Sequence, residues 1–168
     1  VSGLYADVAS WKRDGARYSG VFHTTPDRGY NVAGTIDYNA RINRLEVVFT
    51  PAATTGDGLG QDQIALSLTQ AQKLFETLPN SDTQGLSGLD PKPGGVATGG
   101  ARPAEGVRPE LPQAYNGKLA LDSEGIVRLP DGSTLISDEY GPSIYRFSAE
   151  GEFIDALPVA ESVRPVRN

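Results

Sequence analysis

The stretch that decides the fold covers residues 122–159 and reads DSEGIVRLPDGSTLISDEYGPSIYRFSAEGEFIDALPV. Four short runs rich in strand-forming residues lie within it, at 125–129, 133–137, 143–147 and 152–157. They are separated by turn sequences, Pro130-Asp131-Gly132, Gly141-Pro142 and Glu150-Gly151. The first is typical of a hairpin, because proline fixes φ and Gly132 accepts a positive φ. The stretch therefore predicts a meander of four antiparallel strands, the size of one β-propeller blade.

Alternation within the third run assigns its side chains to two faces. Successive side chains of a strand point to opposite sides of a sheet. Ile144 and Arg146 should therefore share one face, and Tyr145 and Phe147 the other.

The N-terminal part repeats the plan more loosely. Apolar residues predict strands at 4–11, 18–24 and 42–49, with an Asp-Gly turn at 14–15 between the first two. Ile64, Leu66 and Leu68 alternate with smaller residues and predict another strand. Residues 70–78 could equally begin a short helix, and we favour the strand.

Residues 91–117 contain five prolines and six glycines, a composition that predicts a long surface loop. The remaining strands amount to about two blades, whereas a propeller needs at least four, each burying its faces against its neighbours. The fold class is therefore all-β. We expect a partial β-propeller, completed noncovalently by another chain. A self-sufficient small β domain of 168 residues is the alternative.

Composition narrows the classes of partner and site. The 168 residues carry a net charge of −6, which disfavours binding to nucleic acid or to an anionic membrane surface. No apolar run is long enough to span a membrane. Cysteine is absent, so a disulfide, a thiolate metal site and a catalytic thiol are excluded. The chain opens at Val1 without a methionine, as a processed chain would, and we expect a secreted or extracytoplasmic protein.

The acidic residues are concentrated in residues 119–161, which contain nine carboxylates and only two arginines. Glu124 precedes one predicted strand and the pair Asp138 and Glu139 ends the next, so a hairpin could bring them to the same end of the sheet. Carboxylates crowded together are tolerated when a hard cation such as Ca²⁺ compensates their charge. No EF-hand spacing is present, and capping of turn amides beside Gly141 would explain the same residues.

Other candidate residues are fewer. Arg28, next to Asp27, could bind an anionic group through two hydrogen bonds or could pair with a carboxylate. His23 is the single histidine and lies in a strand-like run, where a structural role is more common than catalysis. One histidine cannot build a histidine zinc site.

Two pairs of motifs resemble the phytase-like domain, the family named for the esterase-like activity of phytase. DSEG at 122–125 and SDEYGP at 137–142 form the more specific pair, and PDRGYN at 26–31 with GTI at 34–36 is similar to an earlier region of that family. The resemblance implies a β-propeller much longer than this chain, of which residues 1–168 form the N-terminal part. It implies a functional set made of Asp27, Arg28, Asp122, Glu124, Asp138 and Glu139.

These observations give two hypotheses about function. In the first, the protein hydrolyses a small-molecule ester or phosphate ester with the help of Ca²⁺ near the propeller axis. Glu124, Asp138 and Glu139 would hold the ion, Asp27 or Asp122 would act as the base, and Arg28 would orient an anionic group. In the second, the protein is a non-catalytic binding or scaffold propeller in which calcium is structural.

Overall fold

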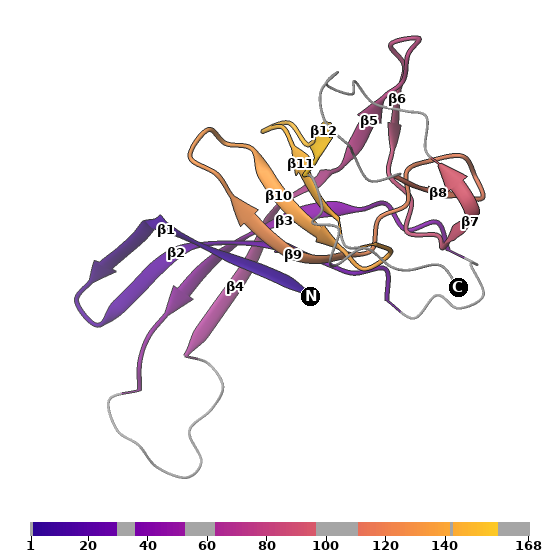
Figure 1. The fold of residues 1–168 in the computed structure, drawn as a ribbon. Helices are drawn as coiled ribbons and strands as arrows, with labels where there is room; N and C mark the ends of the chain where they lie inside the picture. The colour runs from indigo at the N-terminus through magenta and orange to yellow at the C-terminus, as the bar shows by residue number, and fades with distance from the viewer. Residues whose placement is uncertain (1, 30–35, 53–62, 97–110, 142, 158–168) are drawn as a thin grey trace.

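All regular elements in the described part of the chain are β-strands. The computed structural model describes residues 2–29, 36–52, 63–96, 111–141 and 143–157. The first sheet contains four antiparallel strands in chain order, β1 (Gly3–Asp14), β2 (Arg17–Thr25), β3 (Arg41–Phe49) and β4 (Ile64–Lys73). Its long hairpins extend away from the rest of the molecule (Figure 1). Among these residues the structure contains no helix that could cross a membrane.

The second sheet is the predicted meander of residues 122–159. It consists of β9 (Ser123–Arg128), β10 (Thr134–Asp138), β11 (Ile144–Phe147) and β12 (Phe153–Ala156), each paired antiparallel with the next. Gly132 and Gly151 adopt φ values of 85° and 93° in the turns, where a side chain would be strained. All four predicted strands are confirmed.

Two smaller sheets lie along the chain between the first and the second sheet. They are formed by β5 (Phe75–Thr77) with β6 (Thr83–Gly85) and by β7 (Pro91–Val96) with β8 (Pro112–Ala114).

The prediction for residues 64–78 is confirmed, since β4 and β5 occupy this stretch. The prediction of an irregular segment at 91–117 is wrong at both ends, where β7 and β8 pair. Leu111 and Ala114 anchor the second end because both are buried, while residues 97–110 lie outside the described part.

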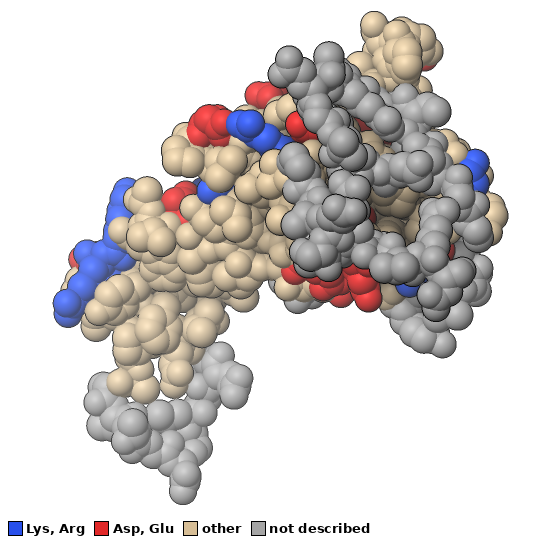
Figure 2. Space-filling view, viewed as in Figure 1, with Lys and Arg blue, Asp and Glu red and all other residues tan. Residues whose placement is uncertain are grey.

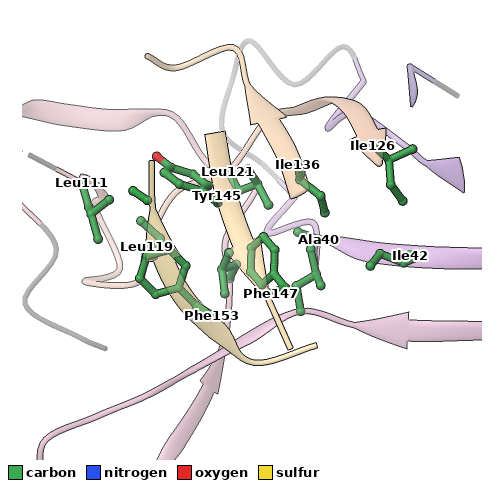
Figure 3. Close-up of a cluster of buried hydrophobic side chains, with 13 residues drawn as sticks. Ala40, Ile42, Leu111, Leu119, Leu121, Ile126, Ile136, Tyr145, Phe147 and Phe153 are labelled. Atoms are coloured by element: carbon green, nitrogen blue, oxygen red, sulfur yellow. The ribbon is translucent and has the colours of Figure 1, made fainter. Parts of the chain in front are cut away.

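The hydrophobic core forms on one face of the second sheet. Tyr145, Phe147 and Phe153 pack edge to face, with ring centroids 5.7 and 5.9 Å apart. Ala40, Ile42 and Leu119, from other parts of the chain, belong to the same buried cluster (Figure 3). The alternation predicted for β11 is confirmed, because Tyr145 and Phe147 are buried while Ile144 is exposed.

The two four-stranded sheets meet where β1 and β2 pass β9. A Cβ atom on Gly3 would lie 3.1 Å from the backbone of Gly125. The Thr25 hydroxyl donates a hydrogen bond of 2.7 Å to Ser123 Oγ in the same region. None of the sheets formed by the described residues closes into a barrel or ring, so the propeller and its completion by another chain stay predictions.

We expect Gly3→Ala to lower the free energy of unfolding by about 1–3 kcal/mol, because the added methyl group would overpack the junction between the sheets. Its Cβ would lie 2.8 Å from Thr25 Cγ2. Gly141→Ala is the matched control, since its nearest neighbour is 3.8 Å away, and it should change stability by less than about 0.5 kcal/mol. Urea unfolding measures both, and equal effects would contradict this account of the junction.

Candidate functional site

The acidic site forms where the start of β9 and the end of β10 meet at one end of the second sheet. Asp122 immediately precedes β9, Glu124 lies within it, and Glu139 follows β10. One carboxylate oxygen from each of these residues lies within 4.8 Å of the others. Asp122 is buried, while Glu124 and Glu139 are exposed. We call these three residues the acidic cluster. Figure 2 shows acidic side chains gathered at the surface beside the start of β1.

Arg28 ties the loop after β2 to this cluster. Its backbone N–H donates to Asp122 Oδ1 at 3.0 Å and its Nε donates to Asp122 Oδ2 at 2.9 Å. The Asp122 residue is only 3% exposed, so this charge is paired within the protein. The structure thus favours the second of the two roles considered for Arg28, pairing with a carboxylate.

Asp138 lies behind the cluster. Its Oδ1 accepts a hydrogen bond from the Asp122 N–H at 2.9 Å, and its Oδ2 accepts one from the Tyr145 hydroxyl at 3.0 Å. Burial raises the pKa of Asp138 to about 7, although both hydrogen bonds oppose this shift. The predicted ligand group of Glu124, Asp138 and Glu139 therefore differs from the observed grouping, in which Asp122 takes the place of Asp138.

Two other carboxyl groups have pKa values shifted in opposite directions. Burial raises the pKa of Glu124, a hydrogen bond with Ser2 opposes the shift, and the neighbouring carboxylates reinforce it. Hydrogen bonds from the Ser2 hydroxyl and the Gly29 N–H lower the pKa of Asp27. Ser2 therefore lies between Asp27 and Glu124, and a positive charge at the cluster would favour ionisation of Glu124.

Sequence reasoning missed three residues that complete the site. Asp90 pairs with Arg28 at 2.7 Å, and the Tyr140 ring lies 5.4 Å from the Arg28 guanidinium carbon. Ser2 donates to Asp27 at 2.6 Å. Tyr140 could have been found, because it belongs to the SDEYGP motif, but no local pattern marks Asp90 or Ser2.

The pairing of Arg28 with Asp122 brings together the motifs at 26–31 and 122–125, of which residues 30 and 31 lie outside the described part. Residues 12–168 match the family model described as phytase-like, esterase-like activity of phytase. The chain belongs to the phytase-like family. An uncharacterized secreted protein of Arthroderma benhamiae is 33% identical to it over 178 aligned positions, which cover 99% of this chain.

The chain spans 33% of the length of that relative. No solved structure matches the chain. The phytase-like family assignment therefore rests on the sequence, and the arrangement of its motifs is seen here from the chain's own geometry.

His23 lies apart from the acidic cluster. Together with Tyr5, Asp7 and Arg128 it lines a cavity of about 450 Å³ between β1–β2 and the β9–β10 hairpin. Burial lowers the pKa of His23, and the positive charge of Arg128 lowers it further. In the sequence, His23 lies outside the motifs at 26–31, 122–125 and 137–142.

We expect Asp122→Asn to destabilise the protein by about 2–4 kcal/mol, because the amide would leave Arg28 without its buried counter-charge and place a donor beside donors. Asp131→Asn is the matched control, since Asp131 pairs with Arg146 at the surface. It should have little effect. Thermal or urea unfolding of both variants measures the difference. An Asp122→Asn protein as stable as the control would show that this pair does not hold the loop.

The lowered pKa of His23 predicts a pH dependence of stability. The unfolded chain binds a proton at His23 near pH 6.5 while the folded chain resists it, so the contribution of His23 to the free energy of unfolding should fall as the pH drops below about 6.5. The raised pKa of Asp138 acts in the opposite direction in both proteins compared. His23→Gln should reduce this loss. The measurement is urea unfolding of both proteins at pH 8 and pH 5. An identical change with pH in the two proteins would contradict the assignment, because His23 is the single histidine of the chain.

Proposed function

We propose that the protein is a secreted hydrolase of small-molecule esters or phosphate esters and that Ca²⁺ assists the reaction. One observation carries this proposal: the acidic cluster lies beside Arg28 in a member of the phytase-like family. The family description supports ester hydrolysis, and the relative described as secreted supports an extracellular location.

The cluster fits the chemistry of calcium. Ca²⁺ binds oxygen ligands at about 2.3–2.6 Å, so two ligands of one ion can lie up to about 5 Å apart. The three carboxylate oxygens of the cluster meet this condition at 4.8 Å or less. Three negative charges this close are also costly without a counter-ion. When bound, the ion would polarise the ester oxygen and lower the pKa of an attacking water.

Each residue of the site then has a distinct role. Glu124 and Glu139 supply exposed carboxylates to the ion, and Asp122 supplies a buried one. Asp138 is not a direct ligand in this proposal, because it is buried behind the acidic cluster and does not belong to it. It holds the Asp122 backbone and thereby positions the buried ligand.

Asp27 and Arg28 would act on the substrate and the water. Hydrogen bonds keep Asp27 ionised to lower pH than an ordinary carboxylate, so it can accept the proton of the attacking water across a wide pH range, as a weak base. Asp122 is the poorer base, since Arg28 engages both of its oxygens. Arg28 also contacts Asp90, and its remaining N–H donors would orient an anionic substrate group.

We also propose that the two four-stranded sheets are blades of an incomplete propeller. Each has four antiparallel strands in chain order, which is the arrangement of a blade. The remaining blades would come from another chain or from further polypeptide of the same domain, held without disulfides because this chain has no cysteine. The acidic cluster would then lie near the propeller axis.

The second candidate is a scaffold or binding propeller with structural calcium. The hydrogen bonds of Asp122 and Asp138 favour it, since these carboxylates join Arg28, β9 and β11 whether or not a reaction occurs. Calcium would then add stability without turnover.

We expect Glu124→Gln to weaken calcium binding at least about tenfold, because it removes one anionic ligand. Hydrolysis of p-nitrophenyl acetate and p-nitrophenyl phosphate should fall about a hundredfold or more. Glu150→Gln is the matched control, because Glu150 lies in the exposed turn before β12. Calorimetry measures calcium binding, and the absorbance of released p-nitrophenol measures hydrolysis of the two substrates. Both assays use the protein together with any chain that copurifies with it.

The outcomes separate the two candidates. Activity retained in Glu124→Gln removes Glu124 from catalysis. If chelation by EDTA lowers the melting temperature while neither substrate is turned over with calcium present, the scaffold is correct.

A further inference from the structure

The first sheet has one strongly apolar face, defined by its register. Residues paired across antiparallel strands point to the same face. One cross-strand row contains Phe22, Leu45 and Leu68, and the next contains Gly20, Val47 and Leu66. A third row places Ile64 beside Phe49. These rows form what we call the outer face of the sheet. The side chains that β2, β3 and β4 contribute to them are uncharged, and on β1 Arg13 lies over the ring of Tyr18 at the end of the third row.

The opposite face, which meets the rest of the molecule, carries polar and charged side chains together with the buried Val21 and Ile42. Its rows contain Glu46 with Ser67 and His23 with Arg44. His23 lines the cavity next to Arg128, and Thr25, on the same face, donates its hydrogen bond to Ser123. The face turned toward the second sheet is therefore mixed in character, whereas the outer face presents exposed apolar side chains along β4.

The outer face is open to solvent along β4. Ile64, Leu66 and Leu68 are 55%, 57% and 61% exposed. Within the described residues β4 pairs with β3 alone, so its other edge has no strand beside it. Figure 1 shows β4 on the outside of the molecule, and Figure 2 shows no charged side chain over it in that view. A contiguous apolar surface at an open edge strand marks an interaction site.

We propose that the outer face docks against an apolar β-sheet face in the remainder of the phytase-like domain. This inference rests on the proposed incomplete propeller. The Arthroderma benhamiae relative contains twice as much polypeptide outside the match as inside it, enough to supply the covering layer. The uncharged side chains that β3 and β4 contribute to the outer-face rows favour an apolar sheet over an acidic or basic partner. Leu66 and Leu68 form the centre of this contact.

The first test uses the protein as isolated from its natural source. Native mass spectrometry gives the mass of the assembly, and hydroxyl-radical footprinting compares it with the separated chain of 17.8 kDa. We expect a partner segment that belongs to the phytase-like family, with oxidation of Leu66 and Leu68 reduced at least fivefold in the assembly while that of the exposed Tyr115 is unchanged. A monomer of 17.8 kDa, a dimer of this chain alone, or protection confined to other residues would overturn the proposal.

The second test compares two adjacent positions on β4. Leu66→Lys places a charge on the outer face, whereas Ser67→Lys places the same charge on the polar face opposite Glu46. We expect recovery of the partner segment with Leu66→Lys to fall at least tenfold and recovery with Ser67→Lys to stay within twofold of the unaltered protein. Leu68→Lys repeats the first substitution, and thermal unfolding checks that each variant is folded. Equal recovery with folded Leu66→Lys and Ser67→Lys would overturn the proposal.

A calcium titration separates this inference from the proposed function. Leu66→Lys should lose the partner and keep the calcium affinity of the acidic cluster, and Glu124→Gln should lose calcium affinity and keep the partner. A protein that never binds calcium would reject the proposed hydrolase while leaving the docking result unchanged.

Discussion

The contact between Arg28 and Asp122 is the constraint on which the site depends. It joins the loop after β2 to the residue that precedes β9, and it uses both the backbone and the side chain of Arg28. Because Asp122 is buried, its charge would be expensive without this partner. The same carboxylate contributes one oxygen to the acidic cluster, so the ion pair and the cluster are coupled. A cation there and the Arg28 guanidinium would share the charge of one side chain.

Asp138 gives this site a second level of support. Its carboxylate accepts hydrogen bonds from the Asp122 backbone N–H and from the hydroxyl of Tyr145, whose ring belongs to the hydrophobic core. The packing of the core against Phe153 is thereby connected through two hydrogen bonds to the exposed carboxylates. The site is consequently positioned by the second sheet and closed by a loop from the first.

Local pattern was enough to predict the strands of the second sheet, because the turns at Gly132 and Gly151 require residues that accept positive φ. It was not enough to show that Asp122, rather than Asp138, lies beside Glu124 and Glu139. The register of β10 shifts between Ser137 and Asp138, and a single bulge changes which side chain points to which side. The strands β7 and β8 escaped prediction because burial of Leu111 and Ala114, rather than propensity, fixes that segment. Asp90 escaped because its contact with Arg28 depends on tertiary structure alone.

The contacts between the sheets also set the order in which the molecule can be made. Thr25 and Ser123 are separated by 98 positions along the chain, and Arg28 and Asp122 by 94. Contacts this distant in sequence slow folding, because the entropy cost of closing a long loop comes before the contacts can stabilise the chain. On a ribosome the N-terminal hairpins would emerge long before their counterpart, with the open edge of β4 unprotected. We therefore expect the yield of native protein to depend on chaperones that shield nascent β-strands until translation has passed Glu139.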